Sequence, residues 1–340
     1  MKFDVTIIPD DLNAVPAITR AVETLGFHAL WTAETSHNPF LPLTHVAANS
    51  RRLNFGTAIA VAFARSPMVT AQIAWDLAAQ SRGRFILGLG TQIRTHIRKR
   101  FSAEWSAPVP RLREYVESMR AIWTAWQDNI PLRYIGNVYK FTLMTPFFSP
   151  GPIEHPYIPV YLSGVNPGLA HLAGEIAQGF HIHPFHTLHY LHTSTLPAIA
   201  SGLQKTGRNR TAIKLSCAIF VVTGSTSDEI NAHKAEVKRQ IAFYASTPSY
   251  KAVLEAHGIG DLQEKLSVLA RQGDWAAMGA AIPDDFLEQV AVIAPAGELA
   301  HAVKARYDGV LDRVGYYFPF IPEDTDKATL WRDAAAVFTS

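Results

Sequence analysis

The chain of 340 residues contains only one cysteine, Cys217. A single cysteine excludes an intrachain disulfide and fits a reducing compartment. Cys217 lies in the apolar run "LSCAIFVV", where we expect a small buried side chain. The opening residues "MKFDVTIIPDD" lack the apolar core of a signal peptide, and no run of 18 apolar residues occurs. The sequence therefore predicts a cytoplasmic protein with no membrane partner.

An excess of charge of one sign is also missing. The formal net charge is +2, from 31 Lys and Arg against 29 Asp and Glu, and the two signs are mixed along the chain. Nucleic-acid and membrane-surface proteins usually carry a basic tract or stripe, which we do not find here. With 48% hydrophobic residues, the composition is that of a globular protein with a large core. We expect no nucleic-acid partner and a small-molecule substrate instead.

Short apolar runs alternate with longer segments of helical spacing. Eight of the runs are predicted strands: residues 3–8, 29–33, 53–60, 85–90, 159–163, 180–183, 214–222 and 313–318. Strands separated by helices indicate a parallel α/β fold, either a doubly wound sheet or a (β/α)8 TIM barrel.

A dinucleotide-binding fingerprint is absent. The first strand is followed by "PDDLNAV", and the stretch "SRGRFILGLGTQ" has Gly88 and Gly90 but no third glycine of G-x-G-x-x-G. The strand count and the length then favour the barrel. In a barrel, Gly90-Thr91-Gln92 would be the carboxyl end of the fourth strand, where such enzymes have their sites.

The segment from residue 227 to about 290 interrupts the alternation. It follows the predicted seventh strand and is mostly helical and charged, as in "HKAEVKRQIAFY". We expect one barrel domain over residues 1–340 with a helical insertion at 227–290. The insertion either covers the barrel mouth or forms a peripheral or oligomer contact.

Several stretches resemble one family of enzymes. They are "LNFGTAIAVAFARSPMVTAQIAWDLAAQSRGRFILGLGTQ", "GFHALWTAETSHNPFLPL", "REYVESMRAIWTAWQ" and "YKFTLMTPFFSPGPIEHPYIPVYLSGVNPGLAHLAGEIAQGF". The chain is similar to the bacterial-luciferase-like superfamily, and most similar to the branch that uses the deazaflavin coenzyme F420 in place of flavin mononucleotide (FMN). The resemblance implies a (β/α)8 barrel with the coenzyme ring across its carboxyl-terminal mouth. It also implies a homodimer, since dimers are common in the superfamily.

The resemblance implies a set of coenzyme-binding residues. A non-prolyl cis peptide bond behind the ring would fall at Ala58-Ile59, and Gly90, Thr91 and Gln92 would contact the ring. His96 would reach the coenzyme tail, although a solvent-exposed histidine is the alternative.

The loop after the fifth strand would hold the phosphate of the coenzyme. The residues that match it are Ser163, Gly164, Val165 and Asn166. Helix N-termini attract anions, and a helix opened by Pro167 follows this loop. The tail of the coenzyme carries a phosphodiester and glutamates, which suit such a site. A simple helix cap is the alternative for this turn.

A proton carrier is expected near the reactive edge of the ring. Several relatives carry a glutamate where this chain has Ile93, so another group must take that role. The resemblance points to His37 as the acid or base, with Glu34 orienting it. The alternative is that "TAETSHNPF" is a capping and turn segment.

Five histidines fall in "HIHPFHTLHYLH". His181 and His183 would share a face of the sixth strand, but no carboxylate or cysteine lies nearby to complete a metal site, and we expect none. His183 and His186 are predicted at the substrate side of the mouth, and His189 and His192 on a helix surface. We expect pocket walls from Trp31, Phe40, Phe63 and the insertion.

Three functions remain open at this point. The first is an oxidoreductase that transfers a hydride between F420 and a small organic substrate. The second is an FMN-dependent luciferase-like monooxygenase, which would consume oxygen. The third is a non-catalytic coenzyme-binding barrel.

Overall fold

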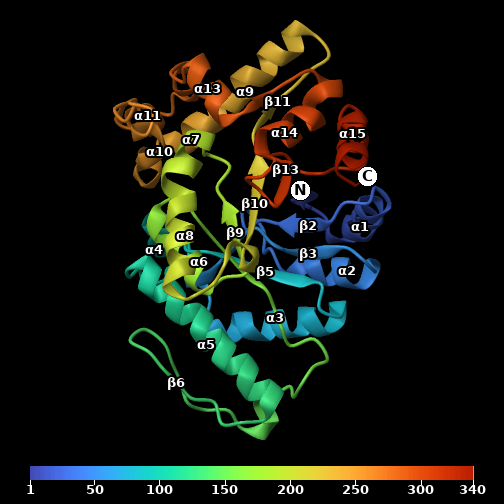
Figure 1. Cartoon of the computed structure of the whole chain (residues 1–340), viewed down its shortest axis with the longest axis vertical. Coiled ribbons are helices and arrows are strands. Elements are labelled where there is room, and N and C mark those ends of the chain that lie inside the picture. The colour runs from blue at the N-terminus through green and yellow to red at the C-terminus, as the bar shows by residue number, and fades with distance from the viewer. Residues whose placement is uncertain (340) are drawn as a thin grey trace.

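A closed barrel of parallel strands, with helices outside it, forms the centre of the molecule (Figure 1). The structure is a computed structural model, and it describes residues 1–339. The barrel strands are β1 Lys2–Ile7, β2 Ala29–Thr32, β3 Asn54–Thr57, β5 Phe85–Gly90, β8 Val160–Gly164, β9 Gly179–Ile182, β10 Lys214–Ile219 and β13 Arg313–Tyr316. These eight strands match the eight predicted runs, and the predicted (β/α)8 TIM barrel is confirmed.

The barrel closes between its first and last strands. Each strand pairs in parallel with the next, from β1 through β2, β3, β5, β8, β9 and β10 to β13. The last strand then returns to the first, with Lys2 opposite Arg313 and Phe3 opposite Val314. Closure leaves no exposed edge in this sheet.

Two predicted strands are interrupted. The third continues after β3 as β4 Ala60–Val61, and the peptide bond between Ala58 and Ile59 is cis, as predicted. The seventh ends at Ile219, and β11 Val221–Val222 pairs instead with β12 Val292–Ile293 in a separate two-stranded sheet. An antiparallel hairpin of β6 Tyr134–Ile135 and β7 Lys140–Phe141 extends away from the barrel (Figure 1).

Helices connect and cover the strands. Those of the barrel are α1 Val15–Thr24, α2 Leu41–Asn49, α3 Pro67–Ser81, α4 Arg94–Lys99, α5 Pro108–Asp128, α6 Pro167–Ile176, α7 Leu188–Tyr190, α8 Leu196–Lys205, α14 Leu299–Tyr307 and α15 Ala328–Thr339. Their ends follow local chemistry: the Ser66 side chain accepts the Met68 N–H at the start of α3, and Arg82 ends it with φ of 55°. Within residues 1–339, no helix is both long and apolar enough to cross a membrane.

The segment after β11 forms a helical layer with its own core. It contains α9 Ser227–Ala245, α10 Lys251–Glu255, α11 Leu262–Gln272, α12 Trp275–Ala280 and α13 Asp284–Val290. Apolar residues of these helices pack on Phe185 and Phe220, which follow β9 and β10. In Figure 1 the layer gathers at one end of the molecule, beyond β10 and β11. Because Phe185 and Phe220 lie past the carboxyl ends of their strands, the insertion covers that side of the barrel mouth.

A buried ion pair lies inside the barrel. The guanidinium of Arg313 donates to both carboxylate oxygens of Asp4, at 2.7 and 2.8 Å, and the indole N–H of Trp31 donates to the same carboxylate at 2.9 Å. Asp4 and Arg313 are 3% and 6% exposed, so water does not solvate the two charges. Each charge is satisfied only because β1, β2 and β13 lie side by side.

Candidate functional site

One side of the barrel mouth is lined by small residues. At the carboxyl ends of β1, β3 and β8, the residues Thr6, Ala58 and Ser163 are partly exposed. Ala58 packs on Trp31 and Tyr161 inside the barrel, and Thr6 lies opposite Trp31 in the pairing of β1 with β2. The side chains at this end of the barrel interior are therefore small.

Gly90 and Ile59 pack against each other at this end of the barrel, and we call this pair the floor of the mouth. A Cβ atom on Gly90 would come within 2.8 Å of the Ile59 Cδ1 atom, so a larger residue there would require the Ile59 side chain to move. Val61 lies opposite Gly90, and on the other side of β5 Leu89 lies opposite Leu162. Two predicted coenzyme-binding segments are thus brought together.

Thr91 and Gln92 continue from this floor into a turn. The Thr91 hydroxyl donates to the Gln92 carbonyl at 3.1 Å, and the Gln92 side-chain oxygen accepts the Ile93 N–H at 3.0 Å. Gln92 has φ of 58°. The side chains of both residues stabilise the turn, which directs the chain into α4.

His96 lies on α4 with an unpartnered polar atom. Its Nδ1 atom is buried and has no hydrogen-bond partner among residues 1–339. A buried ring nitrogen without a partner is costly, and a bound ligand can satisfy it. The predicted contact between His96 and a coenzyme is compatible with this geometry.

The loop after β8 leads into the N-terminus of α6. The Ser163 hydroxyl donates to the His181 carbonyl at 2.8 Å, and Gly164 lies where a Cβ would come within 2.7 Å of Leu169. Asn166 occupies the N-cap position of α6, but its side chain makes no cap and donates to the Ser249 carbonyl of the insertion. The first N–H groups of α6 therefore have no side-chain cap and can receive an anion.

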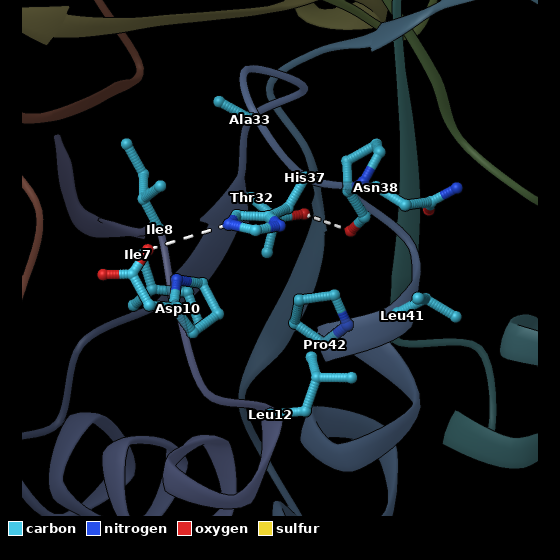
Figure 2. A pocket seen from close by; sticks show the side chains of 12 residues that line it. Ile7, Ile8, Asp10, Leu12, Thr32, Ala33, His37, Asn38, Leu41 and Pro42 are labelled. Carbon is cyan, nitrogen blue, oxygen red and sulfur yellow. Dashed lines mark hydrogen bonds and ion pairs between the residues drawn. The ribbon is translucent and has the colours of Figure 1, made fainter.

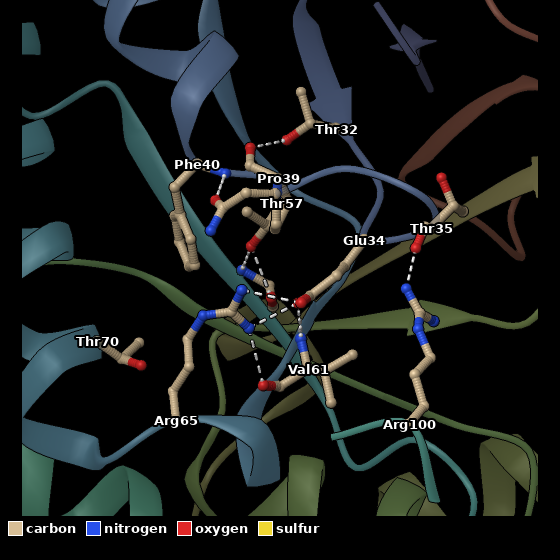
Figure 3. A network of polar contacts seen from close by, with 12 residues as sticks. Thr32, Glu34, Thr35, Pro39, Phe40, Thr57, Val61, Arg65, Thr70 and Arg100 are labelled. Carbon is tan, nitrogen blue, oxygen red and sulfur yellow. Dashed lines mark hydrogen bonds and ion pairs between the residues drawn. The ribbon is translucent and has the colours of Figure 1, made fainter. Parts of the chain in front are cut away.

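Glu34 holds a backbone segment of the mouth through Arg65. The Arg65 guanidinium donates to both Glu34 carboxylate oxygens, at 2.7 and 2.8 Å, and the Val61 N–H donates to Glu34 Oε2 at 2.7 Å (Figure 3). The Glu34 N–H in turn donates to the Ile59 carbonyl at 3.1 Å. Glu34 and Arg65 side chains are 5% and 14% exposed. We call this set of contacts the Glu34–Arg65 clamp.

The predicted pairing of Glu34 with His37 is wrong. The carboxylate of Glu34 is occupied by Arg65 and Val61, whereas His37 Nε2 lies 3.7 Å from Asp10 Oδ1. His37 is 58% exposed and lines a cavity of about 100 Å3 between the loops after β1 and β2 (Figure 2). The turn at residues 35–39 carries His37 toward β1 while Glu34 faces β4, so three residues of separation do not bring the side chains together.

Trp31 and Phe40 do not form the predicted pocket wall. Trp31 is 3% exposed inside the barrel, where its ring packs edge-on against His181. Phe40 is 4% exposed in the main core, with the Arg65 guanidinium 5.4 Å from its ring centre. Phe63 is also buried, at 2% exposed. These aromatic rings are buried in the core, because burying their apolar surface lowers the free energy more than leaving it exposed at the rim of the barrel would.

His183 lies at the end of β9 under the insertion. Its Nδ1 atom accepts the Phe185 N–H at 3.1 Å, so the neutral ring carries its proton on Nε2. Burial, with the neighbouring His186, lowers the pKa of His183 to about 3, and the ring is neutral near pH 7. His183 is thus a fixed hydrogen-bond donor.

His186 is more deeply buried than His183, although both line a small cavity with Gly164 and Val165. It is 2% exposed, and its Nε2 atom lies 3.1 Å from the Tyr307 hydroxyl, while Nδ1 lies 2.9 Å from the His183 carbonyl. Burial lowers its pKa to about 4. Cys217, 3.7 Å away, is buried as predicted, and burial raises the pKa of its thiol. Both ring nitrogens of His186 therefore have partners within the protein, and its predicted place at the substrate side stays a prediction.

Three tyrosines of the mouth were missed by the sequence reasoning. Tyr244 of α9 and Tyr250 before α10 pack on the His183 ring, with centroids 4.7 and 4.8 Å away. The Tyr244 and Tyr317 hydroxyls are hydrogen-bonded. The only sequence feature that could have indicated Tyr244 and Tyr250 was the group of aromatic residues in the insertion. Residues 1–339 contain no cluster of three or more His, Cys, Asp or Glu that could hold a metal ion.

Comparisons with known proteins agree with this architecture. A family model described as luciferase-like monooxygenase matches residues 4–313. An uncharacterized protein of Mycobacterium tuberculosis, Rv1360, is 46% identical over 330 residues, which cover 97% of each chain. The 5,10-methylenetetrahydromethanopterin reductase of Archaeoglobus fulgidus is 26% identical over 297 residues, covering 85% of this chain and 84% of the relative.

A solved structure shares the whole fold. The coenzyme F420-dependent tetrahydromethanopterin reductase of Methanopyrus kandleri superposes with a TM-score of 0.77 at 19% identity, covering 98% of this chain and 97% of the other. At that identity the likeness concerns the fold alone. The match to the family model extends from the first barrel strand to the start of the last. The chain therefore belongs to the luciferase-like monooxygenase family.

Proposed function

We propose that the protein is an oxidoreductase that transfers a hydride between coenzyme F420 and a small organic substrate at the barrel mouth. The observation that supports this most directly is the floor formed by Ile59 against Gly90, next to the partly exposed Ser163. The Ile59 side chain covers Gly90 and would present an apolar surface to a flat tricyclic ring. Members of the family include reductases that are named for this coenzyme.

The chain offers partners for the rest of the coenzyme as well. The uncapped N–H groups at the start of α6 suit a phosphate, and the unpartnered His96 Nδ1 suits a polar group of the tail. When bound, the coenzyme supplies the hydride chemistry, while the protein supplies orientation and handles protons.

His37 is the proposed acid or base. It reaches solvent, and its Nε2 atom lies 3.7 Å from Asp10 Oδ1. Ile93 and the engaged Glu34 leave no free carboxylate at the ends of β2 and β5 for this role. His183 would donate its Nε2 proton in a hydrogen bond to a substrate oxygen, since its neutral ring is held in one tautomer.

The Glu34–Arg65 clamp has a different proposed role. It fixes the backbone of Ile59 and Val61, which form the floor beside Gly90. Glu34 is therefore a positioning residue and not the partner of His37.

An FMN-dependent monooxygenase is the second candidate. The description of the matching family, a luciferase-like monooxygenase, favours it. A deazaflavin has carbon in place of N5 and reacts poorly with oxygen, so the two candidates differ in whether the enzyme consumes oxygen.

A spectral titration of the purified protein with F420 and with FMN tests the proposal. We expect at least tenfold tighter binding of F420, about 1.4 kcal/mol, and turnover without oxygen consumption. Equal or tighter binding of FMN, together with oxygen consumption during turnover, would instead support an FMN-dependent monooxygenase.

A further inference from the structure

The short helix α4 carries an unusual concentration of positive charge. Arg94, Arg98, Lys99 and Arg100 fall within seven residues, and all four are exposed. Only Ile97 of this helix is buried. The nearly balanced net charge of the chain hides this cluster, and the expectation that the chain has no basic tract is wrong for residues 94–100.

Within residues 1–339 none of these four cations pairs with a carboxylate, and Arg100 donates instead to a backbone carbonyl. Among residues 1–339, Arg94, Arg98 and Lys99 make no ion pair with a carboxylate, although fourteen other such pairs occur in that part of the chain. Arg94 and Arg98 are four residues apart on the helix, a spacing at which like charges repel and destabilise it. Arg98, Lys99 and Arg100 lie in or just after the last turn, where cations stabilise a helix C-terminus, but Arg94 in the first turn gains nothing from this effect.

The helix is held at the rim of the proposed coenzyme site. It begins four residues after Gly90, and its last turn is fixed by Arg100, whose guanidinium donates to the Thr35 carbonyl in the loop after β2 (Figure 3). Strands β5 and β8 are paired, so the start of α4 and the Ser163–Asn166 loop follow neighbouring strands at the same end of the barrel. The cations of α4 and the N-terminus of α6 are therefore at the same end of the barrel as the proposed coenzyme site.

We infer that the exposed cations of α4 bind the glutamate tail of the deazaflavin coenzyme. This inference rests on the proposed function and goes beyond it, because it assigns a site to the part of the coenzyme that carries no redox chemistry. The tail is a run of carboxylates, which Arg94, Arg98 and Lys99 can neutralise. FMN has no such run, so the α4 cations would favour the deazaflavin over the flavin. Contacts between exposed charges are screened by salt, which makes this part of the affinity salt-dependent.

A binding experiment with two forms of the coenzyme tests this inference. The protein is titrated with F420 carrying several glutamates and with the same deazaflavin phosphodiester without glutamates, at about 20 and 200 mM salt. The variant is R94Q/R98Q/K99Q. The matched control is R51Q/R52Q/R82Q, which removes three exposed cations just before β3 and β5, at the opposite end of the barrel.

The wild type is expected to bind the tailed coenzyme about tenfold tighter than the tail-free form at low salt, and most of that difference should vanish at high salt. The α4 variant should bind both forms equally, while the control variant should behave as the wild type. A wild type that binds and turns over both forms equally, or an α4 variant that keeps the tenfold difference, overturns the inference but leaves the proposed function intact. A wild type that binds neither deazaflavin overturns both.

Discussion

Replacing Glu34 with alanine should destabilise the protein through the loss of the Glu34–Arg65 clamp. The change removes the acceptor of two Arg65 hydrogen bonds and one Val61 hydrogen bond, all between 2.7 and 2.8 Å. It leaves a guanidinium that is 14% exposed with the Val61 carbonyl and the Phe40 ring as its remaining partners. Breaking one partner of a buried pair costs about 3–5 kcal/mol.

The free energy of unfolding is measured by urea denaturation, followed by fluorescence of the seven tryptophans. Glu34→Ala should lower it by about 3–5 kcal/mol. A double-mutant cycle with Arg65→Ala should give a coupling energy of about 2 kcal/mol or more, since the two residues share one set of contacts. The control is Glu236→Ala, whose half-exposed pair with Arg239 should contribute less than about 1 kcal/mol.

The reasoning fails if Glu34→Ala unfolds within about 0.5 kcal/mol of the wild type. If that variant also loses turnover at saturating coenzyme, Glu34 acts in the chemistry and does not hold the backbone of Ile59 and Val61.

Two further predictions concern histidines. His37→Ala should lower turnover by about 10²-fold or more and change coenzyme affinity by less than a few-fold. The control variant, His192→Ala at an exposed position, should keep both turnover and coenzyme affinity. Normal turnover of His37→Ala would show that His37 is not the acid or base. Because burial lowers the folded-state pKa values of His181, His183 and His186 to about 3, 3 and 4, the unfolded chain binds more protons below about pH 6.5. The free energy of unfolding should therefore decrease as the pH is lowered, by about 1 kcal/mol per histidine between pH 6.5 and pH 5.5. Denaturation of His186→Gln at these two pH values should show a loss smaller by about that amount, and an unchanged loss would contradict the assignment.

Much of the barrel was predictable because buried parallel strands have a simple signature. Runs such as Phe85–Gly90 are apolar on both faces, since one face meets the interior and the other meets helices. The third and seventh strands were predicted too long for the same reason. The apolar pattern continues through Ala58 and Ile59 and through Phe220, although the pairing does not.

The site was less predictable because its contacts join residues that are distant in the sequence. Glu34 pairs with Arg65, 31 residues later, and not with its neighbour His37. Tyr244 and Tyr317 meet across 73 residues. The direction in which a turn sends each side chain decides such contacts, and composition and spacing carry little information on it.

The closure of the barrel also has a consequence for how the chain is made. The carboxylate of Asp4 and the guanidinium of Arg313 are 309 residues apart in sequence, and β1 has no partner on one side until β13 exists. At a synthesis rate of 5–20 residues per second, roughly 15–60 s separate the two strands as they leave the ribosome. During that interval neither the edge of the first strand nor the Asp4 carboxylate can have its partners from β13. The last strand therefore completes both the hydrogen bonding and the charge balance of the first.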